Sequence, residues 1–198
     1  MPRDRWSRGC AAPPDFPAVP PVSLAPVVIL ACGNPSRGDD ALGPMLLDRL
    51  QDWLAGEGLS TGFELIGDFQ WQVEHALDLV GRRLALFLDA GQRTPAPWVF
   101  RQVQALATPT PSSHALSPEA VLAVLARIGQ PAPPTFVLGV AGERFELGEG
   151  LSAAASRHAE GAFALLQVLC RTPRVDAWQA LATGRPGGIV RWPARDAE

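Results

Sequence analysis

The sequence contains no lysine and no tyrosine, and all 17 of its basic residues are arginine. Together with the abundance of alanine, glycine and proline, this pattern is typical of a genome-wide composition bias and points to no function. Cysteine is scarce as well: Cys10, Cys32 and Cys170 are odd in number, widely spaced and form no CxxC pair. This pattern argues against a disulfide framework and a cysteine-based zinc motif. Cys32 ends an apolar run, which favours a buried, inert thiol.

An excess of positive charge is also missing. The net charge of −3 provides no electrostatic basis for binding nucleic acid or a membrane surface. No apolar stretch approaches the roughly 20 residues that a membrane span needs, and residues 1–26 lack the continuous apolar core of a secretory signal. We therefore expect a cytoplasmic protein with neither nucleic acid nor a membrane as partner. The length of 198 residues suits one domain with a full hydrophobic core.

Several motifs of common enzyme classes are absent. The chain contains no G-x-G-x-x-G, G-x-S-x-G or H-E-x-x-H, so dinucleotide-binding, serine-hydrolase and zincin interpretations lose their usual support. Gly33 and Gly38 have the spacing of a phosphate-binding loop, but Asp39 and Asp40 follow where Lys and Ser or Thr are needed. Two acids repel phosphate and attract cations. A nucleotide-binding α/β protein therefore remains only a weak alternative.

The apolar pattern of the chain predicts its fold. Short apolar runs alternate with segments of helical periodicity, which is typical of a three-layer α/β/α domain with a mostly parallel, twisted central sheet of about five strands. The partly alternating segment Trp98–Leu106 fits an antiparallel edge strand. We expect a Pro-rich N-terminal extension at residues 1–24, the α/β domain at residues 25–171, and a C-terminal tail without periodicity at residues 172–198.

Helix signals accompany this pattern. Ser117, followed by Pro118, and Ser152 are expected to cap two helices. Residues 71–80 resemble a short helix whose inward face is formed by four apolar residues, namely Val73, Ala76, Leu77 and Val80.

Acidic residues follow two of the predicted strands. Asp39 and Asp40 come after the apolar run Val27–Cys32, and Asp89 ends the run LALFLD. Each acid taken alone is explained by capping of a helix or turn, worth about 0.3–1 kcal/mol near a helix N-terminus. However, the carboxyl ends of parallel strands meet at one edge of the sheet, where ligands bind. His114 is expected to reach the same edge, and two carboxylates with one imidazole suit Zn²⁺ or Ni²⁺.

Three segments resemble one known family. GNPSRGDDALGP is similar to the N-terminal signature of the [NiFe]-hydrogenase maturation endopeptidases, LFLDA to their second metal-ligand strand, and SSHALSP to the loop that bears their histidine ligand. The resemblance extends from about Val27 to Leu169. The segments DFQWQVEHALDL, HALSP and FELGEGLS look more like the branch that serves cytoplasmic NAD-reducing hydrogenases than like the membrane-uptake branch.

The resemblance implies an activity and its site. Such endopeptidases remove the C-terminal extension of the hydrogenase large-subunit precursor after nickel has been inserted. The family's catalytic and metal-contacting positions correspond to Asp40, Asp89 and His114. The nickel is carried by the substrate, and another divalent metal is expected to occupy the site in isolation. Well-known members have Glu at the position of Asp40, and the family often has Gly at the position of Ala41.

Further residues are assigned supporting roles. Asp39 is expected to cap the following helix or to orient a ligand, and Asn34 to hold the turn by hydrogen bonds to the backbone. Asp68, Gln70 and Glu74 are candidates for contact with the substrate, whereas His75 is expected on a solvated helix face. A non-catalytic accessory protein that binds metal or precursor with the same fold is the alternative function.

Overall fold

Five strands form one sheet in the computed structural model, which describes residues 24–106 and 116–182. Their order across the sheet is β2-β1-β3-β5-β4. The strands are β1 (Val27–Cys32), β2 (Phe63–Asp68), β3 (Leu84–Gly91), β4 (Trp98–Val103) and β5 (Thr135–Ala141). Every residue of β1, β3 and β5 is buried, as expected for central strands that are covered on both faces.

The strand directions agree with the sequence pattern. β1 runs parallel to β2 and β3, and β3 runs parallel to β5. The outermost strand β4 is antiparallel to β5, so the predicted antiparallel edge is confirmed. The predicted α/β fold with a mostly parallel five-stranded sheet is therefore correct.

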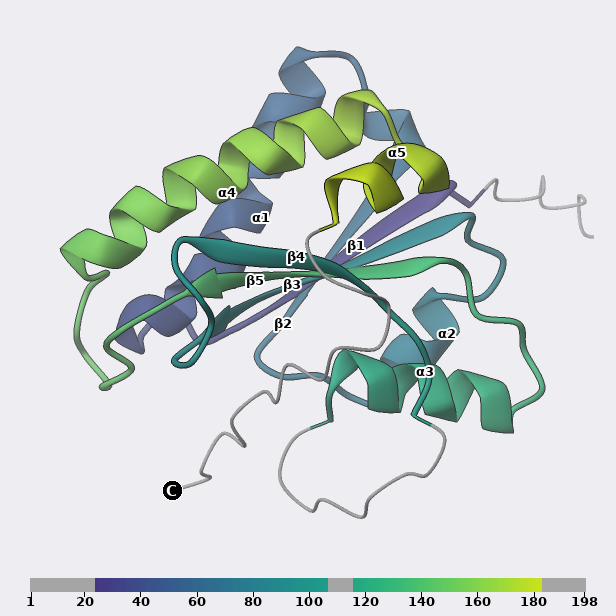
Figure 1. The fold of residues 1–198 in the computed structure, drawn as a ribbon, viewed down its shortest axis with the longest axis horizontal. Coiled ribbons are helices and arrows are strands. Elements are labelled where there is room, and N and C mark those ends of the chain that lie inside the picture. The colour runs from purple at the N-terminus through teal and green to yellow at the C-terminus, as the bar shows by residue number, and fades with distance from the viewer. Residues whose placement is uncertain (1–23, 107–115, 183–198) are drawn as a thin grey trace, which may run out of the picture.

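Helices cover both faces of this sheet and complete the three layers (Figure 1). One face packs against α1 (Leu42–Gly56), α4 (Ala153–Arg171) and α5 (Val175–Leu181). The other face packs against α2 (His75–Asp78) and α3 (Pro118–Arg127). Two short 3-10 helices, η1 (Gly38–Ala41) and η2 (Ser60–Gly62), precede α1 and β2.

The two predicted serine caps are present. The Ser117 hydroxyl accepts a hydrogen bond from the Ala120 backbone N–H at 3.3 Å, and Pro118 occupies the first turn of α3. The Ser152 hydroxyl accepts one from Ala155 N–H at 3.0 Å at the start of α4. Each satisfies a backbone donor that has no partner inside its helix.

The predicted helix at residues 71–80 is wrong in length and in the face it buries. Only His75–Asp78 is α-helical. Val73 and Leu77 are 48% and 64% exposed, whereas His75, Ala76 and Leu79 are buried. The buried face therefore contains His75, whose ring packs beside Trp71, and leaves Val73 and Leu77 exposed.

The C-terminal segment contains structure that its lack of periodicity did not indicate. Residues Val175–Leu181 form α5, and Trp178 is fully buried. Its indole donates a hydrogen bond to the Leu169 carbonyl oxygen at 3.0 Å and packs on Phe100 and Phe136. Packed structure thus continues past the predicted boundary at residue 171. Of the predicted N-terminal extension, residues 1–23 lie outside the described residues.

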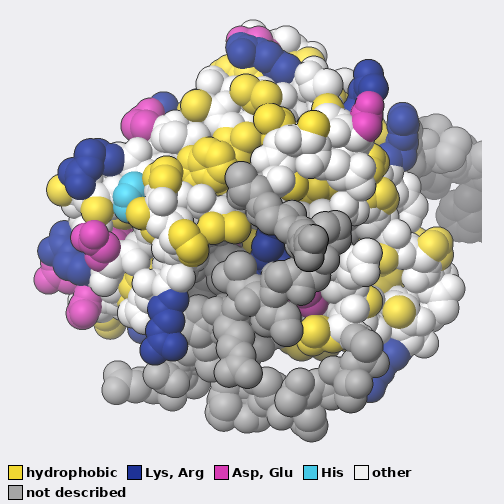
Figure 2. All heavy atoms as spheres, viewed as in Figure 1, with side chains coloured by type: hydrophobic (Ala, Val, Ile, Leu, Met, Phe, Trp, Pro, Cys, Tyr) yellow, Lys and Arg dark blue, Asp and Glu magenta, His cyan; other side chains and the backbone are white. Residues whose placement is uncertain are grey.

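The surface mixes charges of both signs. On the face seen in Figure 2, Arg side chains lie beside Asp and Glu side chains and do not gather into a patch of one sign. Arg49, for example, forms a bidentate ion pair with Glu160, and its guanidinium stacks over the Phe163 ring. Within residues 24–106 and 116–182, every helix is too short or too polar to cross a membrane.

Candidate active site

The turn after β1 is held in shape by its own side chains and by β2. The Gly33 backbone N–H donates to the Asp68 carbonyl oxygen at 3.1 Å. The Asn34 side-chain oxygen accepts from Ser36 N–H at 2.9 Å, which confirms the predicted role of Asn34 in this turn. Gly33 has a φ of 149°, and a Cβ atom there would lie 2.0 Å from the Asp40 carbonyl oxygen. Only glycine fits this close approach.

Asp40 lies in η1 and is 4% exposed. Its Oδ2 accepts a hydrogen bond from the Asn34 backbone N–H at 2.8 Å, so the carboxylate joins the end of the loop to its beginning. The next residue, Ala41, has φ −69° and ψ −10°, an ordinary right-handed conformation. The glycine that the family resemblance leads one to expect at this position is therefore not needed for the backbone of this chain.

Asp89 lies near the carboxyl end of β3 and is 5% exposed. Its Oδ1 accepts from Ala90 N–H at 2.8 Å. Leu88 is level with Ala31 of β1, so Asp89 stands where β1 reaches its end, and η1 contacts β3. The structure thus places Asp40, in η1 after β1, and Asp89, near the end of the neighbouring parallel strand β3, at the same edge of the sheet.

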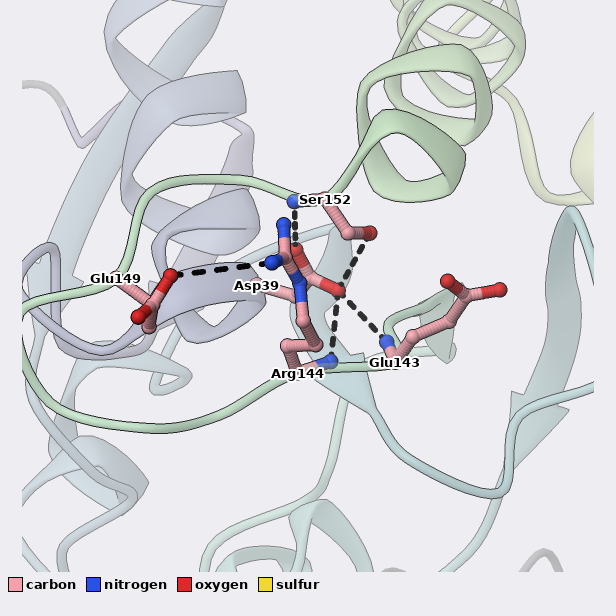
Figure 3. A network of polar contacts seen from close by, with 5 residues as sticks. All are labelled: Asp39, Glu143, Arg144, Glu149 and Ser152. Atoms are coloured by element: carbon pink, nitrogen blue, oxygen red, sulfur yellow. Dashed lines mark hydrogen bonds and ion pairs between the residues drawn. The ribbon is translucent and has the colours of Figure 1, made fainter.

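Asp39, the other acid of the pair, is fully buried and turned toward a different part of the chain (Figure 3). Its Oδ2 accepts from Glu143 N–H at 2.7 Å, Arg144 N–H at 3.0 Å and the Ser152 hydroxyl at 2.9 Å, and its Oδ1 accepts from Ser152 N–H at 2.6 Å. Burial by itself would raise the pKa of Asp39, but these hydrogen bonds outweigh burial and lower it below the ordinary value of 3.8.

The prediction that Asp39 caps the following helix is wrong. The N-cap residue of α1 is Ala41, which makes no side-chain cap hydrogen bond, and the hydrogen-bond donors named above for the Asp39 carboxylate all lie elsewhere. Asp39 instead binds the segment between β5 and α4 and the cap residue of α4 itself. Ser152 therefore has a role at the site that its helix-capping pattern alone did not reveal. The sequence contains one signal for this role: of two adjacent acids only one can face the sheet edge, so the other needs a partner elsewhere.

Further bonds connect the turn after β1 with residues 142–151. Four donors and acceptors pair across the two segments: Gly38 N–H with Glu149 O at 3.0 Å, Asp39 N–H with Arg144 O at 2.7 Å, Gly148 N–H with Ser36 O at 2.8 Å, and Arg37 Nε–H with Phe145 O at 3.3 Å. Near them, Arg144 and Glu149 form an exposed ion pair at 3.8 Å. The loop that carries Asp40 is thus fixed from both sides.

The residues predicted to contact the substrate differ in exposure and in hydrogen bonding. Asp68 ends β2, and its side chain is 30% exposed. Its Oδ1 accepts from Phe69 N–H at 2.6 Å, and its Oδ2 from the Gln72 side-chain amide at 3.3 Å. Gln70 and Glu74 are exposed. His75 is 5% exposed, so its expected place on a solvated face is wrong.

The predicted third ligand, His114, lies outside the described residues. Within residues 24–106 and 116–182, no group of three or more His, Cys, Asp or Glu side chains could hold a metal ion. Of the three predicted ligands, the described residues therefore include only Asp40 and Asp89. His158 is half-buried on α4, with Nδ1 2.8 Å from the Ala141 carbonyl oxygen.

Solved structures share this architecture. The hydrogenase maturating endopeptidase HybD from E. coli superimposes with a TM-score of 0.58 at 23% identity, over 74% of this chain and 93% of that one. The fold is that of the hydrogenase maturation endopeptidases. The [NiFe] hydrogenase maturation protease HycI from Thermococcus kodakarensis KOD1 has a TM-score of 0.57 at 21% identity, over 75% and 94% of the two chains.

An endopeptidase from Escherichia coli, solved in solution, has a TM-score of 0.58 at 24% identity, over 74% and 93% of the chains. No protein-family model and no curated protein sequence matches this chain. The likeness therefore concerns the fold, and the expected membership of the branch for NAD-reducing hydrogenases stays a prediction.

Proposed function

We propose that this protein is an endopeptidase that removes the C-terminal extension from the nickel-loaded large-subunit precursor of a [NiFe] hydrogenase. The observation that carries the proposal is a pair of buried carboxylates: Asp40 in η1, which follows β1, and Asp89 near the carboxyl end of the neighbouring parallel strand β3. This is the edge where open α/β sheets bind ligands, and the fold is that of solved hydrogenase maturation endopeptidases.

The nickel ion belongs to the substrate in this proposal. Asp40 and Asp89 offer it carboxylate oxygens, and His114 offers a ring nitrogen, which is a donor set that suits Ni²⁺ or Zn²⁺. The contact of these residues with nickel selects the loaded precursor and positions its scissile peptide. Another divalent metal occupies the same donors when the protein is isolated. The cytoplasmic location expected from the sequence is part of the proposal.

The surrounding residues serve the same purpose. Asp39 bonds the loop to the segment between β5 and α4. Asp40 is therefore already ordered before the precursor binds, and binding does not have to bear the entropy cost of ordering it. Asn34 binds Asp40 directly through its backbone N–H. Asp68, and with it the exposed Gln70 and Glu74, contact the precursor beside the site.

A cleavage assay tests the proposal. The full chain is incubated with nickel-loaded and nickel-free precursor, and the loss of the extension is followed by mass spectrometry. We expect cleavage of the loaded form only. Asp40→Asn, Asp89→Asn and His114→Ala should each lower the rate at least about 100-fold, while Asp48→Asn on the exposed side of α1 serves as the control. Full cleavage by Asp40→Asn would reject the assigned site. Binding of precursor without cleavage by the wild type would indicate the non-catalytic accessory protein instead.

A further inference from the structure

His75 is a buried histidine with two defined polar partners. Its Nδ1 accepts a hydrogen bond from the Gln72 backbone N–H at 2.9 Å. Its Nε2 lies 3.5 Å from Oδ2 of Asp68. The ring packs edge-on against Trp71, with 6.0 Å between the ring centroids. Because Nδ1 is an acceptor, the neutral ring carries its proton on Nε2, the ring nitrogen that lies on the side of the Asp68 carboxylate.

Asp68 connects this histidine to the candidate active site. Its carbonyl oxygen binds the N–H of Gly33, the residue that lies directly against the Asp40 backbone. Its carboxylate accepts hydrogen bonds from Phe69 N–H and the Gln72 side-chain amide and lies 3.5 Å from the His75 ring, yet the side chain remains 30% exposed. An ionised carboxylate only accepts hydrogen bonds. The group that Asp68 can bind at this position is therefore a donor, such as a backbone N–H or a cationic side chain.

We propose that His75 is a positioning residue, which holds the Asp68 carboxylate in place to accept a hydrogen bond from an N–H group of the precursor's C-terminal segment. This inference rests on the proposed function, because the segment is that of the cleaved substrate. His75 itself stays buried and does not touch the substrate. Its effect on the reaction passes through Asp68 and concerns the binding of the precursor and not the chemical step.

Two variants separate positioning from packing. In His75→Asn, the side-chain oxygen lies near the place of Nδ1 and still accepts from Gln72, but the donor to Asp68 is lost. In His75→Gln, the amide nitrogen reaches the place of Nε2 and still donates to Asp68, but the acceptor for Gln72 N–H is lost. If the role of His75 were merely structural, the variant with the larger loss of Tm would also have the larger rise in KM for nickel-loaded precursor.

We expect the two properties to separate. His75→Asn should raise KM about tenfold with kcat unchanged and a small change in Tm. His75→Gln should lower Tm more but restore KM to within about twofold of the wild type. Asp68→Asn should raise KM as His75→Asn does, and the double variant should be no worse than either single one. Asp48→Asn is the control for unspecific effects.

The tautomer of His75 is measured separately, from its ring nitrogen chemical shifts in the full-length protein. The chain has three histidines, so the His75→Asn variant identifies the signals by subtraction. A proton on Nδ1 would overturn the inference whatever the enzymatic activity. An unchanged KM in His75→Asn and Asp68→Asn, with normal cleavage by the wild type, would also overturn it. Absence of cleavage by the wild type would reject the proposed function instead and leave the tautomer result to decide the geometry.

Discussion

The carboxylate of Asp39 binds Ser152 twice, through the serine backbone N–H at 2.6 Å and through its hydroxyl at 2.9 Å. The same hydroxyl also caps α4 by accepting from Ala155 N–H. One buried carboxylate thus connects the loop after β1 with the start of α4, over a separation of 113 residues. Because this loop carries Asp40, the connection sets where a candidate catalytic residue stands.

Replacement of Asp39 by asparagine should destabilise the protein. An asparagine has one acceptor oxygen where the carboxylate has two, and its NH₂ group would face N–H donors in a fully buried place. We expect a loss of about 2–3 kcal/mol in the free energy of unfolding, measured by urea denaturation. Asp48→Asn, which changes an exposed residue in the same way, should stay within about 0.5 kcal/mol of the wild type. Equal stability of the two variants would contradict the assigned network.

The same residue predicts a dependence of stability on pH. The pKa of Asp39 is lower in the folded protein than in the unfolded chain, because its hydrogen bonds outweigh its burial. Its contribution is therefore fully present above about pH 5 and is lost as the pH falls through the lowered pKa. The difference in unfolding free energy between wild type and Asp39→Asn should accordingly shrink from about pH 5 to about pH 2. A difference that stays constant over this range would show that Asp39 does not ionise differently on folding.

Gly43 at the start of α1 should not tolerate a side chain. A Cβ atom there would lie 2.3 Å from the carbonyl oxygen of Cys32, so helix and strand would have to move apart. We expect Gly43→Ala to cost about 1–3 kcal/mol in unfolding experiments. Gly56→Ala at the other end of the same helix is the matched control, since nothing lies within 4 Å of its Cβ position. It should be neutral or stabilise the protein by up to about 1 kcal/mol.

Trp178 should contribute strongly to stability although it lies beyond the predicted domain boundary. Its ring is fully buried against Phe100 and Phe136 and donates to the Leu169 carbonyl oxygen. Trp178→Ala is expected to lower the free energy of unfolding by about 3–5 kcal/mol. Leu181→Ala in the same helix removes a side chain that is 40% exposed and should cost much less. If the two losses are similar, α5 does not pack as described.

The sequence predicted those parts of the fold that depend on local pattern. Val27–Cys32 is apolar throughout because both of its faces are covered, and Ser117 and Ser152 cap helices by contacts within three residues. The edge position of Asp40 and Asp89 followed from the same alternation of strands and helices. Such features need no knowledge of distant partners.

The errors concern contacts between residues that are far apart or in irregular segments. The partners of Asp39 lie 104 to 113 positions away, and no local signal distinguishes them from a cap of the next helix. The helical pattern of residues 71–80 favours Val73 and Leu77 as inward residues and leaves His75 facing solvent. In the structure His75 is buried, and Val73 and Leu77 are exposed. Trp178 gives no signal in the sequence because one large aromatic residue creates no periodicity, although its side chain is fully buried in the core.

The strand order explains why Asp40 and Asp89 are neighbours. The chain moves from β1 outward to β2 through α1 on one face of the sheet, and then returns past β1 to β3 through α2 on the other face. The direction of winding therefore reverses between β1 and β3. At such a switch point the loops that follow the two strands lead to opposite faces of the sheet. Asp40 and Asp89 flank this reversal. Their neighbourhood is a result of connectivity more than of particular side chains, and the fold that contains this connectivity is shared by chains of 24% identity or less.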